Sequence, residues 1–262
     1  METENHPEPR LHHFMKNLRF SIPLKSVLLA AGMLAGGLFA SFGAGTGATV
    51  VSLGSASVQL VTPAGYLDCS GENDQISNLA GNFCPPENRL LGVFVSPEFR
   101  HGLLAGDTTA SFDYVMVETP RTAVWSDISD ADFTEAKTSV KNAQAEAFAQ
   151  ADADTKDAIN SLNHSLQAAT GADVRFNLAE PVSLGVFDES ARHVSMLMLM
   201  RMQMQAGGAT QQINVAASIS LVHLKGKVLF AYSYRTYTGE KSVQALKKMT
   251  SDWTAALEKA NP

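Results

Sequence analysis

Short stretches in which apolar and polar residues alternate predict strands in the first half of the chain. Residues 57–62 alternate in this way and stop at Pro63, which cannot donate a hydrogen bond to a neighbouring strand. Residues 90–95 and 112–117 have the apolar character of two further strands. Residues 68–89 are rich in Gly, Asn, Asp and Pro, so we predict a loop there.

A helical period replaces the alternation after Ser129. Ser129 and Asp132 are spaced like the two polar residues of a capping box, which marks the first turn of a helix. Apolar residues at spacings of three and four follow: Phe133, Ala136, Val140, Ala143, Ala147 and Ala151, then Ala158, Leu162, Leu166 and Ala169. One helix through both sets would be about 60 Å long, so we predict a break near residues 152–154. A coiled-coil partner for this stripe is the alternative.

After Gly171 the period returns to two. Five stretches predict strands: residues 174–178, 182–187, 194–204, 213–224 and 228–237. Lys225 and Gly226 separate the last two, which predicts a tight hairpin turn, so the last three strands form an antiparallel meander. A helix is predicted over residues 242–259. Its buried face is expected to hold Val243, Leu246, Trp253 and Leu257, with Met249 or Thr250.

Strands, a helix, a strand meander and a closing helix together predict an α+β fold. The meander strands are apolar on both faces, with Met198 and Met200 on one and Leu197 and Leu199 on the other. A sheet of this kind needs cover on both sides. We therefore expect an antiparallel sheet between helices, an α/β/α sandwich, preceded by an N-terminal apolar export or anchor segment.

This order of elements resembles the PsbP/Mog1-like fold, an antiparallel sheet between helices. The resemblance rests on Pro63-Ala64-Gly65-Tyr66 after the opening strand, on the hairpin at Lys225-Gly226, and on the closing helix with Trp253. It spans most of the chain after the apolar segment and is one of architecture. It implies an accessory or binding domain, for the most part non-enzymatic, and it assigns no catalytic residue here. A helix-grip, lipid-binding fold is the alternative, because it also ends a strand meander with a long helix.

The N-terminal part has the layout of an export signal. An apolar run over residues 26–40 follows four basic residues, and the uncharged stretch continues through Leu53. The basic residues are Arg10, Lys16, Arg19 and Lys25. The stretch fits either a cleaved signal peptide or an uncleaved transmembrane anchor, and both place the C-terminal part outside the cytoplasm. A start at Met15 instead of Met1 would favour the cleaved signal.

Three regions follow from this layout. Residues 1–25 are a basic region that we expect to be disordered on the cytoplasmic side, and residues 26–53 are the signal peptide or anchor. Residues 54–262 are the exported α+β domain, which is periplasmic, membrane-anchored or secreted.

Composition and charge limit the classes of protein and partner. Hydrophobic residues make up 45% of the 262 residues, which argues against general disorder. There are 20 basic and 26 acidic side chains, a formal net charge of −6. An acidic chain argues against a nucleic-acid partner. Near the C-terminal end, Arg235, Lys247 and Lys248 are candidates for contact with anionic lipid or a protein partner.

No common catalytic motif occurs in the sequence. Gly-x-Ser-x-Gly, His-Glu-x-x-His, Ser-x-x-Lys and the phosphate-binding Gly-rich loop are all missing. His223, in a predicted strand, is interpreted as a structural histidine. We predict no catalytic residue and no cofactor. An enzyme whose active site is assembled from scattered residues is the alternative, and it predicts Asp, His or Arg side chains converging in one pocket.

Cys69 and Cys84 are the only cysteines, and both lie in the part that we expect to be exported. Oxidation persists outside the cytoplasm, so a disulfide that closes a loop of about 15 residues is predicted. The alternative is two separate buried thiols. Two thiols are too few for a four-cysteine zinc site.

Five methionines alternate along one predicted strand: Met196, Met198, Met200, Met202 and Met204. Alternation places them on one face. We interpret this face as core packing beneath a helix. A plastic apolar groove for a peptide or lipid and a Cu(I) site of thioether ligands are the alternatives.

The sequence therefore predicts an exported accessory or binding domain without catalytic activity, either anchored in the membrane or released from it. Its partner would be a protein or a small apolar ligand, with membrane contact through the N-terminal segment. A soft-metal binder, a lipid binder and an enzyme remain the alternative functions.

Overall fold

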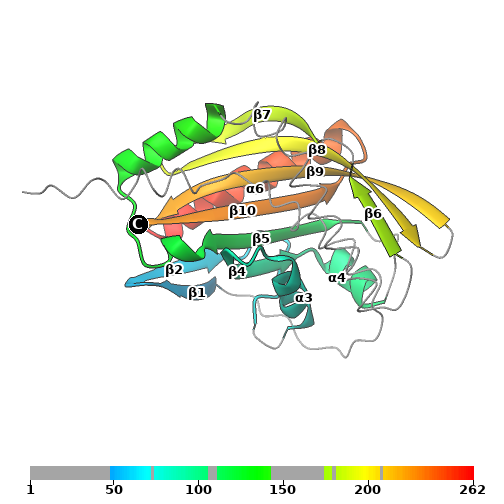
Figure 1. Cartoon of the computed structure of the whole chain (residues 1–262), viewed down its shortest axis with the longest axis horizontal. Coiled ribbons are helices and arrows are strands. Elements are labelled where there is room, and N and C mark those ends of the chain that lie inside the picture. The colour runs from blue at the N-terminus through cyan, green and yellow to red at the C-terminus, as the bar shows by residue number, and fades with distance from the viewer. Residues whose placement is uncertain (1–47, 72–73, 106–110, 143–173, 179–180, 207–208) are drawn as a thin grey trace, which may run out of the picture.

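The computed structural model describes residues 48–71, 74–105, 111–142, 174–178, 181–206 and 209–262 (Figure 1). These ranges form an eight-stranded sheet, in which every pairing is antiparallel, and a separate two-stranded hairpin. The α+β class and the antiparallel sheet predicted from the sequence are confirmed. The apolar segment before residue 48 lies outside the described residues.

The sheet runs in the order β3-β4-β5-β10-β9-β8-β6, and β7 also pairs with β8. Its strands are β3 (Leu67–Asp68), β4 (Asn88–Val95), β5 (Asp113–Pro120), β6 (Val174–Leu178), β7 (Val182–Glu189), β8 (His193–Ala206), β9 (Ala209–Leu224) and β10 (Lys227–Thr236). The pairing of β5 with β10 joins the two halves of the chain at the centre of the sheet.

The meander β8–β9–β10 forms as the alternating pattern predicted. β9 and β10 are joined by Lys225 and Gly226 alone, and these residues have φ angles of 51° and 75°. Positive φ at both central residues defines the type I′ turn, whose twist matches that of the flanking strands. Gly226 adopts such an angle at little cost, so this turn fixes the register of the hairpin.

Helices and a hairpin cover the two faces of the sheet. On one face, α3 (Gln75–Phe83), α4 (Pro97–Leu104) and a helix over residues 130–142 contribute to a core cluster with Met116, Met196 and Met198. On the other face, α6 (Glu240–Ala260) and the hairpin of β1 (Ala48–Leu53) and β2 (Ala56–Val61) pack on the sheet. Figure 1 shows α6 running along β8, β9 and β10. The predicted cover on both faces is present among the described residues.

The predicted helix ends agree with the structure where it describes them. Ser129 Oγ accepts the backbone N–H of Asp132, and the Asp132 carboxylate lies 3.4 Å from the backbone nitrogen of Ser129, as in a capping box. Val243, Leu246, Trp253 and Leu257 are buried on α6, together with Thr250 rather than the half-buried Met249. The predicted break near residues 152–154 and the apolar stripe beyond it lie outside the described residues.

Two helices were not predicted. Residues 75–83, within the expected loop, form α3, because the side chain of Asp74 accepts the N–H of Ile76 and because Ile76 and Ala80 are buried on one face. Residues 97–104 form α4, which Ser96 caps by accepting the N–H of Phe99. Both helices are short, so their apolar stripes are too brief to stand out from loop composition.

The N-terminal hairpin changes one boundary. Residues 48–53, which the sequence assigned to the end of the apolar segment, form β1 and pair with β2. Val51 and Leu53 point into the core, whereas Val50 and Ser52 are exposed. The alternation that marks this strand is hidden in the sequence because its outward positions carry apolar or small uncharged residues.

Candidate functional site

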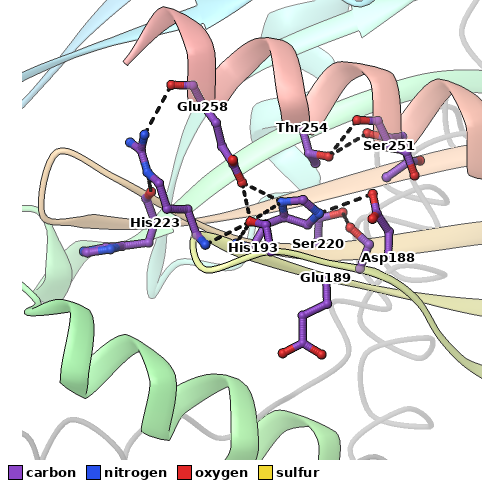
Figure 2. A network of polar contacts seen from close by, with 12 residues as sticks. Asp188, Glu189, His193, Ser220, His223, Ser251, Thr254 and Glu258 are labelled. Atoms are coloured by element: carbon purple, nitrogen blue, oxygen red, sulfur yellow. Dashed lines mark hydrogen bonds and ion pairs between the residues drawn. The ribbon is translucent and has the colours of Figure 1, made fainter. Parts of the chain in front are cut away.

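A network of polar side chains lies where the turn between β7 and β8 meets the end of α6 (Figure 2). His193, which is 4% exposed, is at its centre. Its Nδ1 donates to Glu258 Oε1 at 2.6 Å, and its Nε2 lies 3.2 Å from Asp188 Oδ2, close enough for an ion pair but without hydrogen-bond geometry.

Ser190 closes the turn beside this histidine. Its Oγ donates to Glu258 Oε1 at 2.6 Å and accepts the backbone N–H groups of Arg192 and His193 at 2.9 and 3.1 Å. The same oxygen lies 2.9 Å from His193 Nδ1. Ser190 therefore holds the turn in shape while it binds the helix.

Arg192 and Asn261 extend the network along the last turn of α6. Arg192 donates to the backbone oxygens of His223, Glu258 and Asn261. The guanidinium therefore satisfies carbonyl groups that a helix end leaves without partners. Asn261 is fully buried and pairs with the backbone of Gln59 on β2. The network thus joins α6 and β2 to the β7–β8 turn and to the end of β9, which lie at the same end of the β8–β9 pair because His193 pairs with Val222.

Serine, histidine and carboxylates are the parts of a hydrolytic triad, but their arrangement differs here. In a triad, the serine and the carboxylate contact opposite nitrogens of the imidazole. Here Ser190 and Glu258 share Nδ1, and the serine proton is already donated to Glu258. The hydrogen bonds of Ser190 Oγ all go to residues of the β7–β8 turn and of α6. We therefore interpret this network as a tie between elements, not as a nucleophile with its base.

A second set of contacts fixes the segment from Val124 to Asp130. Lys227, 2% exposed, donates to the backbone oxygen of Ser126 at 3.0 Å and forms an ion pair with Asp127 at 2.7 Å. The N–H of Ile128 donates to the carbonyl of Gly226 at 2.8 Å, and the carbonyl of Ile128 accepts from His223 Nε2 at 2.8 Å.

His223 also stacks on a ring of the adjacent helix. Its imidazole lies 4.9 Å from the ring of Phe133, centroid to centroid, with 17° between the planes, and its Nδ1 lies 3.3 Å from Asp130. The histidine is buried and has partners at both nitrogens. These contacts agree with the interpretation of His223 as a structural histidine.

Trp125 projects from this fixed segment into solvent. It is 81% exposed, the most exposed of the large hydrophobic side chains described. Its backbone lies against the turn of the β1–β2 hairpin: a Cβ built on Gly54 would be 2.9 Å from the carbonyl oxygen of Val124 and 3.6 Å from the Cα of Trp125. Gly54 has φ of 59° and must remain small for the two loops to meet. A large aromatic side chain is thus presented on a rigid backbone.

Two further polar clusters are buried near α3 and β5. Tyr66 donates to Asp113, which also accepts from Arg235 at 2.8 Å, and burial and then Asp113 raise the pKa of the Tyr66 phenol. Glu118, fully buried, accepts from Asn88 at 2.9 Å. Arg235, a candidate for partner contact from the sequence, is thus paired within the fold.

Cys69 and Cys84 are both free thiols in the structure. Burial raises the pKa of Cys69 to about 12, and burial followed by the charge of Glu118 raises the pKa of Cys84 as well. The charged neighbours of Cys69 are Asp74, Arg100 and Asp68, whereas those of Cys84 are Glu118, Arg121 and Glu87. The predicted disulfide receives no support from these environments and stays a prediction.

The described methionines of β8 are packed in the core. Met196, Met198, Met200 and Met202 are each at most 5% exposed and belong to the cluster beneath α3, α4 and the helix over residues 130–142. The side chain of Met204 lies outside the description. This burial agrees with the packing interpretation, and the groove and Cu(I) alternatives stay untested.

The described residues offer neither a metal site nor a membrane-spanning helix. They contain no group of three or more His, Cys, Asp or Glu side chains placed to hold a metal ion. Within the same ranges, no helix combines the length and hydropathy needed to span a bilayer. Of the predicted signal or anchor, residues 26–53, only residues 48–53 fall within these ranges, where they form β1.

Sequence reasoning missed both the polar network and Trp125. The contacts that tie this network to the end of α6 join residues 65 or more positions apart, such as His193 and Glu258, so no local motif indicates them. Trp125 follows a short 3₁₀ turn over Arg121–Ala123, outside any periodic stretch. An isolated tryptophan among polar residues was the one available signal.

Comparisons with known proteins give a weak likeness of fold. No family model matches the chain, and no curated protein matches it by sequence. A structure of a mutant of protein Mog1 has a TM-score of 0.28 and 14% identity, covering 82% of this chain and 90% of that chain. The Saccharomyces cerevisiae Ran-binding protein Mog1p has a TM-score of 0.25 and 14% identity, covering 82% and 91%. The chain is thus weakly similar to Mog1 in fold, as its order of elements suggested, and this likeness carries no inference about function.

Proposed function

We propose that this chain is an exported accessory domain, held at the membrane by the apolar segment before residue 48, that binds its partner through a surface around Trp125. This Trp125 surface consists of Arg121, Thr122, Trp125, Ser126 and Asp127, all of which are exposed. The exposure of Trp125 on a fixed backbone is the observation that carries the proposal.

An exposed tryptophan contributes little to folding, because its ring stays in water in the folded state. At a binding surface the same side chain contributes strongly, because tryptophan is among the residues that most often dominate binding energy. The backbone around Trp125 is fixed by Lys227, Gly54 and Ile128. Such a ring is already positioned before binding, so less conformational entropy is lost on association.

Export is supported by the order of charge and hydropathy at the N-terminus. Basic residues precede the apolar run, and no charged residue occurs between Lys25 and Asp68. A reporter that is active only outside the cytoplasm, fused after Pro262, should be active. A stably expressed but inactive fusion would show that the domain is not exported.

Crosslinking in the cell tests the binding surface. A photo-crosslinking amino acid replaces Trp125 in the full chain, and a matched variant carries it at Val182, which is 57% exposed on β7. We expect adducts at position 125 that do not occur at position 182. A partner identified in this way, once purified, should bind the W125A chain at least about tenfold more weakly than the wild type, as expected for a hot-spot aromatic residue. Identical adducts at both positions would refute the proposal.

A further inference from the structure

We infer that the partner of the Trp125 surface is the membrane surface itself, a bilayer with anionic headgroups, and that the β1–β2 hairpin lies on it together with Trp125. This inference rests on the proposed function. It names a lipid surface as the occupant, and a protein partner is an outcome that the experiment below would reveal.

The hairpin has the composition of a surface next to lipid. Residues 48–61, which form it, contain no charged side chain. Its inner positions, including Val51 and Leu53, are buried in the core, whereas Val50 on the outer face is 63% exposed. The outward residues Ser52 and Ser57 are also exposed, and neither is charged. An uncharged outer face with an exposed valine fits the interfacial region of a bilayer.

The path of the chain places this hairpin at the membrane. Ala48, the first residue of β1, directly follows the uncharged stretch that begins at Ser26. A span of about 20 residues from Ser26 would end near residue 45. The chain advances at most about 3.5 Å per residue, so Ala48 would start within roughly 10 Å of the edge of the hydrocarbon region.

Trp125 lies at the turn of the same hairpin, because its Cα is 3.6 Å from a Cβ built on Gly54. Tryptophan is enriched where membrane proteins meet the headgroup region, since its ring is apolar and its indole N–H can reach polar groups. The turn of the hairpin and Trp125 are thus adjacent. They come from different parts of the chain, and neither the hairpin residues nor Trp125 carry a charge.

Basic side chains border the hairpin. Arg89 donates to the carbonyl of Ser52 at 3.0 Å, and Lys225 donates to the carbonyl of Ser57 at 2.9 Å. Two nearby acids have partners within the fold: Asp68 accepts from Thr49, and Asp127 pairs with Lys227 while 72% of its side chain stays exposed. Lysine and arginine next to a membrane are attracted to anionic lipids. Arg89 and Lys225 could therefore contact anionic headgroups around the apolar residues of the hairpin and Trp125.

Lipid quenching of fluorescence tests this inference. The full chain with W253F retains Trp125 as its only tryptophan, and it is reconstituted in phosphatidylcholine–phosphatidylglycerol vesicles with or without lipids brominated on their acyl chains. We expect brominated lipid to quench Trp125 strongly and the membrane to reduce quenching by aqueous acrylamide. Trp253 is buried and donates to Val61, so W253F can impair folding. In that case, subtracting the quenching of the W125F chain from that of the wild type gives the quenching of Trp125.

A matched control distinguishes contact of the Trp125 surface with lipid from quenching of any tryptophan in a membrane-anchored domain. The chain with W125F, W253F and V182W carries its only tryptophan on β7 at the opposite part of the sheet. This tryptophan should stay unquenched by brominated lipid and accessible to acrylamide. Equal quenching at both positions would overturn the inference.

The outcomes distinguish the two proposals. If the chain floats with the vesicles but brominated lipid leaves Trp125 unquenched, the membrane inference is wrong, and a protein adduct at position 125 would leave the proposed function intact. If the chain does not float with the vesicles, the proposed anchoring fails and the inference fails with it.

Discussion

Asn261 is expected to be among the residues on which the stability of this domain depends most strongly, although it lies after the last helix. Its side chain substitutes for a strand at the free edge of β2: Oδ1 accepts the N–H of Gln59 at 2.8 Å, and Nδ2 donates to the carbonyl of Gln59 at 2.8 Å. Nδ2 also donates to the carbonyl of Leu257 at 2.9 Å. The side chain thereby joins the hairpin to the end of α6.

The loss of unfolding free energy in Asn261→Ala can be estimated from these contacts. Three hydrogen bonds are lost at a fully buried residue, and each contributes about 1 kcal/mol net, so the free energy of unfolding should fall by about 3 kcal/mol. In a domain of this size that corresponds to a decrease in Tm of roughly 6–12 °C. The measurement is urea unfolding of the full chain in mild detergent, followed by far-ultraviolet circular dichroism and by tryptophan fluorescence.

Two further variants separate the hydrogen bonds from other effects. Asn261→Asp keeps the acceptor for Gln59 but turns a carboxylate toward the carbonyls of Gln59 and Leu257, so it should destabilise at least as much as Asn261→Ala. Lys259→Ala, at an exposed position, should change stability by less than about 0.5 kcal/mol. An Asn261→Ala chain as stable as the Lys259→Ala chain would refute the reasoning.

Four other variants or treatments test separate parts of the structure. Trp125→Ala should leave the free energy of unfolding within about 0.5 kcal/mol of the wild type, because the ring is 81% exposed; a larger loss would mean that the ring packs in the fold. Met198→Ala with Met200→Ala should destabilise the domain by several kcal/mol, at about 2–5 kcal/mol for each buried methionine, whereas a fully stable double variant that loses Cu(I) binding would favour the metal alternative. Alkylation of the exported protein under denaturing conditions without reductant should add no group if Cys69 and Cys84 are bridged, and two added groups would exclude the disulfide. In the reduced protein, burial raises the pKa of Cys69 from 9.0 to about 12. The unfolded chain therefore releases this proton first, so stability should fall as the pH rises above about 9, and less steeply in the Cys69→Ala chain.

Prediction from the sequence succeeded where local chemistry decides the structure. The turn at Lys225-Gly226, the capping box at Ser129 and the alternation along β8 each depend on residues within a few positions, and the structure has all three. α3 and α4 were missed because each is less than three turns long and depends on one capping side chain and two or three buried residues. β1 was missed because its exposed positions are not charged.

The candidate sites were harder to predict because distant residues build them. The backbone of Trp125 is held by the turn of one hairpin and by Lys227 from β10, and neither contact has a signal near position 125. The partners of His193 come from β7 and α6. A sequence pattern can place a residue on a face of an element, but only the packing of elements decides which faces meet.

The pairing of β5 with β10 has a consequence for when the domain can fold. The central pair of the sheet joins Asp113–Pro120 to Lys227–Thr236, so the strands on the β5 side gain their neighbour only after most of the chain has been synthesised. Folds dominated by contacts between distant residues form slowly, because a long loop must close before any contact stabilises it. If the chain is exported as proposed, a delay of this kind would let the unfolded chain pass through a narrow translocation channel before the sheet assembles.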